Sequence, residues 1–263
     1  MSKVFNEMNL EQMKEAAPSI FTEKASSKVS EKYSFIPTSR LVEDMAVLGW
    51  KPFEAKEVKI KKNKDQRQGY QKHFIRFRNP DIFISDENGI EAFPELLITN
   101  QHDGMGSFSV HCGIFRLVCS NGLVVADKSF GKRTIRHYGY SFEEVRKVVE
   151  DFIVILPGLV DKINVFKQTE LTENQMSELA LKASLIRWNK KETPIDHLLL
   201  LSARRNDDMP NNMWCVLNRI QENLINGGYT NLKGRNVRAV KNFTMDLRVN
   251  RELFELAEQY ISN

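Results

Sequence analysis

Residues 69–78 read GYQKHFIRFR, and their pattern indicates a β-sheet in the N-terminal half. Two sets of side chains alternate along it: His73, Ile75 and Phe77 in one set, and Lys72, Phe74, Arg76 and Arg78 in the other. Alternate residues of a β-strand point to opposite faces of its sheet. The pattern therefore predicts a strand in a sheet with one buried face and one basic, aromatic-bearing face.

The flanking sequence supplies partners for this strand. Residues 51–60 (KPFEAKEVKI) predict a neighbouring strand, and residues 94–100 (PELLITN) predict a third. Residues 107–125 predict further extended structure with a turn at Asn121-Gly122, because Asn-Gly between two apolar runs is typical of a hairpin. Upstream, residues 38–50 (TSRLVEDMAVLGW) show helical spacing.

The C-terminal half shows helical patterns throughout. Ser141 and Glu144 form a capping box before a helix that we expect Pro157-Gly158 to kink or stop. Further helices are expected from Thr172, from Thr193-Pro194 through residue 205, over residues 213–226 and over residues 251–261. The predicted fold is α+β: an N-terminal mixed antiparallel sheet with helices, followed by a helical C-terminal half.

Length and composition indicate an ordinary globular protein. The chain has 263 residues, of which 41% are hydrophobic and 27% charged. We expect an N-terminal segment and linker (1–36), an α+β sheet domain (37–168) and a helical C-terminal region (169–263). No apolar run reaches the roughly 20 residues of a membrane helix, and three cysteines fit a reducing compartment. The expected location is the cytoplasm.

The positive charge is concentrated in three segments. Residues 56–78 carry nine basic and two acidic side chains, residues 128–147 carry six and two, and residues 233–251 carry six and one. The net charge of the whole chain is only +4, so the rest of the chain is acidic. If the segments converge, they create a field that attracts a polyanion. The alternative is three independent solvated faces.

Aromatic residues are interleaved with the cations in the first two segments. Single-strand-binding proteins combine cations that contact phosphates with rings that stack on bases. The candidate nucleic-acid contacts are Lys72, Phe74, Arg76, Arg78, Lys128, Phe130, Lys132, Arg133, Arg136 and Tyr138. In the alternative interpretation, the rings belong to the core and the cations only solubilise the protein.

A polar loop offers a second candidate site. Asn100, His102 and Asp103 lie in the sequence TNQHDGMGSF (residues 99–108). A histidine beside an aspartate could perform acid–base work or bind a metal, whereas Asp103-Gly104 equally predicts a turn. The remaining histidine and cysteine residues lack the spacing of a zinc site. The sequence therefore predicts no metal and no cofactor.

Residues 100–125 (NQHDGMGSFSVHCGIFRLVCSNGLVV) and 213–261 resemble a phage- and plasmid-borne protein family of unknown function. The shared features are an Asn-x-x-Asp-Gly-like turn, an Arg-Leu-Val-Cys-Ser-Asn-Gly core and a helical C-terminal portion. The resemblance covers most of the chain from about residue 38 and implies a gene of a mobile element. It brings no catalytic residue.

The order of elements also resembles that of ring-forming single-strand annealing proteins. A helix ends in LGW (residues 48–50), strands with a basic face follow, and a long helix begins near FEEVRKVVEDF (residues 142–152). That resemblance implies a basic groove for DNA and an oligomer. The long segment at residues 81–107 and the helical C-terminal half depart from it.

These observations leave three functional hypotheses. The first is a non-enzymatic protein that binds nucleic acid, with single-stranded DNA favoured, in recombination or replication. The second is an interaction protein that inhibits a host defence or restriction system through a host protein partner. The third is a metal-dependent hydrolase or nuclease centred on His102 and Asp103.

Overall fold

The computed structural model describes residues 6–60, 67–86, 89–116, 122–124, 133–135, 141–188 and 193–261. The chain divides into two compact units. The first unit comprises Met1–Leu117 and Asp127–Leu156, and the second comprises Val118–Ala126 and Pro157–Asn263. The domain boundaries expected at residues 36 and 168 stay predictions.

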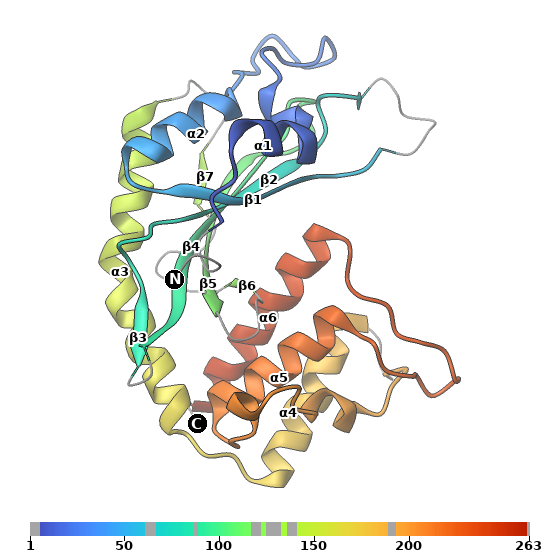
Figure 1. Cartoon of the computed structure of the whole chain (residues 1–263). Helices are drawn as coiled ribbons and strands as arrows, with labels where there is room; N and C mark the ends of the chain where they lie inside the picture. The colour runs from blue at the N-terminus through green and yellow to red at the C-terminus, as the bar shows by residue number, and fades with distance from the viewer. Residues whose placement is uncertain are drawn as a thin grey trace. The chain divides into compact units, whose positions relative to one another are not determined.

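The first unit is built on an antiparallel sheet in which neighbouring strands follow the order β1-β2-β4-β5 (Figure 1). A short β3 pairs with β4, and β7 pairs with β5. The strands are β1 (Lys51–Glu57), β2 (His73–Arg78), β3 (Ile84–Asp86), β4 (Gly89–Asn100), β5 (Phe108–Arg116) and β7 (Arg133–Ile135). Strands β1, β2, the end of β4 and β5 therefore form where the sequence predicts extended structure.

The hydrophobic core of the first unit lies on one face of this sheet. Ile75 and Phe77 of β2 pack there with apolar residues of β4 and β5. Helix α2 (Thr38–Val47) and the first half of α3 (Phe142–Gln168) supply the other layer. The indole of Trp50, which follows α2, lies 5.8 Å from the Phe152 ring of α3. Because alternate positions of each strand feed this core, the sheet register fixes what faces away from it.

The N-terminal segment belongs to the same core. Asn9 caps helix α1 (Leu10–Ala16) in a reciprocal capping box with Gln12, and a short 3₁₀ helix (Pro18–Phe21) follows. Met13 and Ile20 are fully buried against the sheet layer. The segment expected as an N-terminal segment and linker thus contains a helix and packs against the domain that follows.

The second unit is helical, as predicted. It contains the second half of α3 with α4 (Glu173–Trp188), α5 (Met213–Asn226) and α6 (Phe243–Ile261). Helix α5 is buried from Met213 to Leu224, polar positions included, and packs against both α4 and α6. Strand β6 (Gly122–Val124) also belongs to this unit, where it contacts α6. The α+β fold class is confirmed.

Two helix boundaries differ from the prediction. Of the two outcomes expected at Pro157-Gly158, the stop is wrong, because Leu159, Ile163 and Phe166 extend the buried apolar stripe of α3 beyond the proline to Gln168. The kink stays a prediction. The helix expected over residues 193–205 is reduced to a 3₁₀ turn (His197–Leu201). There the Asn223 side chain donates to the carbonyls of Leu200 and Ser202 over 3.1 and 2.9 Å, so these oxygens bond to α5 instead.

Within the described ranges, no helix combines the length and the apolar character that crossing a membrane requires.

Candidate nucleic-acid interface

The chain between α5 and α6 forms a small antiparallel hairpin, which we call the basic hairpin (residues 228–242). Figure 1 shows it in orange-red, leaving the end of α5 and returning to the start of α6. The amide of Gly228 donates to the Val237 carbonyl over 2.9 Å, and the Val237 amide donates to the Tyr229 carbonyl over 2.8 Å. An antiparallel bridge continues this pairing one residue further in each arm. The hairpin is thus a defined structure rather than an open loop.

Asn231 fixes the tip of the basic hairpin. Its side-chain oxygen accepts hydrogen bonds from the backbone N–H groups of Lys233 and Arg235, each over 2.9 Å. Its carbonyl accepts from the Gly234 amide over 2.9 Å. Gly234 has φ +71°, a left-handed conformation that glycine adopts without steric cost. These local bonds hold the flanking cations at defined positions.

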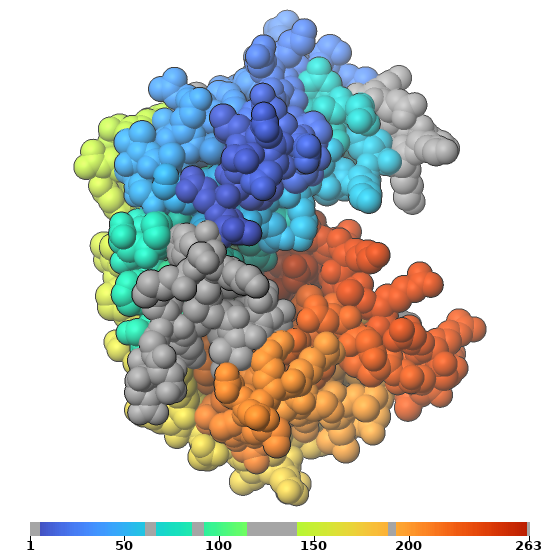
Figure 2. Space-filling model, in the orientation of Figure 1, coloured from blue at the N-terminus to red at the C-terminus, as the bar shows by residue number. Residues whose placement is uncertain are grey.

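Four cations and no acid occur in the basic hairpin: Lys233, Arg235, Arg238 and Lys241. All four are exposed, and none forms an ion pair with a carboxylate in the described part of the chain. The tip also carries Leu232, whose exposed fraction is 71%. Figure 2 shows the orange-red part of the second unit projecting at its surface. The hairpin therefore presents uncompensated positive charge to solvent.

Two arginines anchor the hairpin to α5: the buried Arg187 and the exposed Arg204. The Arg187 guanidinium donates to the carbonyls of Leu224 and Arg238, the latter over 2.5 Å. Arg204 donates to the Gly227 carbonyl over 2.7 Å. The last carbonyls of a helix have no partner within the helix, so these guanidiniums satisfy them and favour the negative end of the helix dipole. Burial lowers the pKa of Arg187, and Tyr229 opposes that shift.

Gly227 sits where the hairpin returns against the end of α5. It has φ +61°, and a Cβ placed on it would lie only 2.4 Å from the Val237 carbonyl oxygen. A side chain at this position would therefore collide with the backbone of the returning strand. Gly227, directly after the last residue of α5, therefore permits the close approach that builds the hairpin.

The candidate contacts on β2 have different surroundings. Arg76 and Arg78 are both buried, and their guanidiniums donate to the two oxygens of the fully buried Glu95 over 2.8 and 2.7 Å. Arg76 also pairs with Glu54 over 3.0 Å, and Arg78 stacks over the Phe53 ring. The face of β2 expected to be open and basic is therefore buried and neutralised. Both guanidiniums are buried and bonded to carboxylates of the protein, so we assign them no contact with phosphate.

The neighbouring positions of β2 offer little more surface. The Phe74 ring is 6% exposed, and the Lys56 ammonium lies 5.8 Å from its centroid. Lys72, which directly precedes the strand, is half-buried. A base cannot stack on a ring that is already covered, so no stacking contact is placed on Phe74.

Most of the candidate contacts in the second basic segment lie outside the residues that the structure describes. Lys128, Phe130, Lys132, Arg136 and Tyr138 lie outside the described residues, and only the backbone of Arg133 is described, in β7. Their assignment as nucleic-acid contacts stays a prediction.

The side chains of the polar loop form hydrogen bonds with other parts of the first unit. His102 is fully buried, and its Nε2 lies 3.4 Å from the Thr38 hydroxyl. Asn100 donates to the same hydroxyl over 2.9 Å. Asp103 accepts from Arg67 over 2.6 Å and from the Met105 amide over 3.1 Å, which is the turn expected from its Asp-Gly sequence. These side chains form hydrogen bonds within the protein, so we assign them no catalytic or metal-binding role.

A second buried histidine, His73, contacts the same Thr38 hydroxyl. His73 Nδ1 lies 3.1 Å from the Gln71 carbonyl, to which it donates, and Nε2 lies 2.9 Å from the Thr38 hydroxyl. The pKa of His73 is lowered to about 3, first by burial and then by the neighbouring His102. The histidine is therefore neutral and joins helix α2 to strand β2.

Within the described residues, no cluster of three or more His, Cys, Asp or Glu side chains is placed to hold a metal ion.

The sequence shows the positive charge of residues 233–251, but the predicted nucleic-acid contacts lie only in the first two basic segments, where aromatic residues alternate with the cations. The signal was present as four basic residues without an acid between two predicted helices. The anchoring arginines carry no such signal, because their partners are backbone carbonyls that become neighbours only in the folded chain.

A family model described as a domain of unknown function (DUF932) matches residues 25–254. This chain belongs to that family. The expected membership in a family of unknown function is therefore confirmed, whereas a phage or plasmid origin stays a prediction.

Two relatives come from Escherichia coli strain K12: the UPF0380 protein YfjQ and the UPF0380 protein YafZ. Each is 31% identical to this chain over 259 residues, which cover 96% of this chain and 91% of the relative. No solved structure matches the chain. The resemblance to ring-forming single-strand annealing proteins stays a prediction.

Proposed function

We propose that this protein binds nucleic acid without cleaving it, and that the basic hairpin is a principal contact with the phosphate backbone. The observation that supports this proposal is the set of four exposed cations on a braced hairpin, with no acidic residue within it. Lysine and arginine side chains that neutralise phosphates release condensed counterions, which drives binding that is independent of base sequence.

The bracing of the hairpin favours this use. Cations on a disordered loop lose conformational entropy when they order on a ligand. Here the Asn231 bonds at the tip and the Arg187 and Arg204 bonds at the base fix the backbone beforehand. Only the side-chain ends remain to be ordered on the phosphates.

The direct test is a titration of a fluorescein-labelled single-stranded oligonucleotide, followed by anisotropy at low salt. We expect the double charge reversal K233E/R235E to weaken binding at least tenfold, since each reversal replaces an attraction by a repulsion. The matched control is K24E/K32E, which changes the net charge equally at two exposed lysines of the first unit. Equal weakening in both variants would show that net charge, and not the hairpin, governs binding.

Duplex DNA and RNA of the same length serve as further probes. If the protein contacts only phosphates, its affinity should be similar for single-stranded DNA and single-stranded RNA. A place in recombination or replication and a cytoplasmic location belong to the same proposal. The alternative of a protein that inhibits a host defence system stays a prediction.

A further inference from the structure

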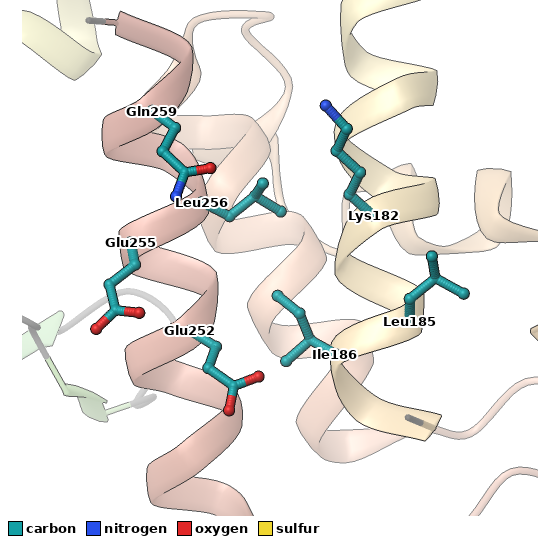
Figure 3. Close-up of a pocket in the computed structure, with 7 residues that line it drawn as sticks. All are labelled: Lys182, Leu185, Ile186, Glu252, Glu255, Leu256 and Gln259. Carbon is teal, nitrogen blue, oxygen red and sulfur yellow. The ribbon is translucent and has the colours of Figure 1, made fainter. Parts of the chain in front are cut away.

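A groove runs between α4 and α6 in the second unit. Its volume is about 290 Å³, near the lower end for ligand pockets, so it suits one or two side chains better than a cofactor. Figure 3 shows Leu185 and Ile186 of α4 on one side and Leu256 of α6 on the other. Glu252 and Glu255 of α6 project along the same wall.

Helix α4 carries apolar side chains on two sides. Its core stripe includes the buried Leu179 and Ala183. Away from that stripe, Leu181 is 40% exposed and Leu185 is half-buried one turn later. When a helix carries exposed apolar residues outside its core-facing stripe, those residues typically form a second contact surface.

The rim of the groove carries two carboxylates, Glu252 and Glu255, that form only long ion pairs. The Lys182 ammonium is bonded to Glu178 over 2.7 Å. Glu252 forms an ion pair with Arg248, and Glu255 forms one with Arg251, each over 3.8 Å, which is longer than a hydrogen bond. Both carboxylates therefore keep oxygens that can accept from an incoming cation.

The complement of this groove is present on the same chain. The tip of the basic hairpin presents an exposed Leu232 beside Lys233 and Arg235. An apolar anchor flanked by cations matches an apolar floor flanked by carboxylates. The contact uses two different surfaces of the protein, so it is heterologous and can repeat from copy to copy.

We propose that the hairpin tip of one copy inserts Leu232 into the α4–α6 groove of a second copy, with Lys233 and Arg235 paired to Glu252 and Glu255. The interface is small, so the self-association is weak, with a dissociation constant on the order of micromolar or above. It uses the same hairpin as the proposed function but does not require that nucleic acid binds.

Sedimentation velocity of the full-length chain tests the proposal, up to about 200 µM because a small interface is weak. We expect the weight-average sedimentation coefficient of the wild type to rise with concentration. The variants K233E/R235E and E252K/E255K should each stay monomeric, and L232S should weaken association at least tenfold. The control K24E/K32E should associate as the wild type does.

Mixing the two charge-reversed variants gives the sharpest result. In the mixture an acidic hairpin meets a basic groove, and a basic hairpin meets an acidic groove, so we expect association to return. A wild type that is monomeric throughout, or association that the variants leave unchanged and mixing does not restore, would overturn the proposal. The E252K/E255K variant keeps the hairpin intact, so its oligonucleotide affinity reports separately on the proposed function.

Discussion

At the scale of single residues, His73 shows how burial assigns a role that sequence cannot. It contacts Gln71, Thr38 of helix α2 and Ser19 of the N-terminal segment. The alternation in residues 69–78 places it on the core face, but its partners lie 35 and 54 positions away in the sequence. Its hydrogen-bonding role was therefore outside what the pattern could predict.

The lowered pKa of His73 makes stability depend on pH. In the unfolded chain its pKa is near 6.5, whereas in the folded protein it is about 3, so the unfolded state binds more protons between these values. Stability should therefore fall as pH drops below about 6.5, by on the order of 1 kcal/mol per pH unit from this group.

Urea midpoints measured between pH 7 and pH 4.5 check this dependence. The variant His73→Gln removes the titrating group and keeps a polar side chain that can bond to Thr38. Its midpoint should change less with pH than that of the wild type. Identical pH profiles for the two proteins would contradict the assignment.

Arg76 and Arg78 give the complementary lesson at the residue scale. Their alternation on β2 was visible, but their neutralisation depends on Glu95, which the register places opposite Arg78 on β4. Strand register is set by packing and turns, not by the pattern of one strand. A charge pattern alone therefore could not distinguish a ligand-binding face from an internal ion network.

At the scale of elements, the sequence predicted the strands and helices whose periodicity is strong. It was wrong where tertiary contacts override local signals. Pro157 does not end α3, because the apolar stripe continues beyond it, and Asn223 of α5 draws the carbonyls of residues 200 and 202 away from a longer helix. Neither effect can be read from the residues that form the element.

Two glycines of the second unit should respond oppositely to alanine. Gly158 is exposed inside α3 with open space around its missing Cβ, so Gly158→Ala should stabilise the unit by roughly 0.5–1 kcal/mol. Gly227→Ala should destabilise it by about 1–3 kcal/mol, because its backbone conformation and the nearby Val237 carbonyl both exclude a side chain.

Differential scanning calorimetry of the two variants separates these effects. The midpoint should rise by a few degrees for Gly158→Ala and fall by several degrees for Gly227→Ala. A Gly227→Ala variant with the wild-type midpoint would mean that the base of the hairpin is not held as the structure shows.

At the scale of the whole molecule, charge location matters more than the net +4. Of the three basic segments seen in the sequence, the first places two of its arginines in a buried ion network. The third carries four exposed cations on a braced hairpin. Sequence could locate the charge, but only the fold shows which part of it faces solvent.

The salt dependence of oligonucleotide binding shows whether the hairpin cations contact phosphates. If the four hairpin cations contact phosphates, the slope of log K against log salt concentration should be roughly −3 for a single strand. The K233E/R235E variant should reduce that slope to roughly half or less, and K24E/K32E should leave it unchanged. A wild-type affinity that does not change with salt, or equal slopes for the wild type and the hairpin variant, would contradict the account.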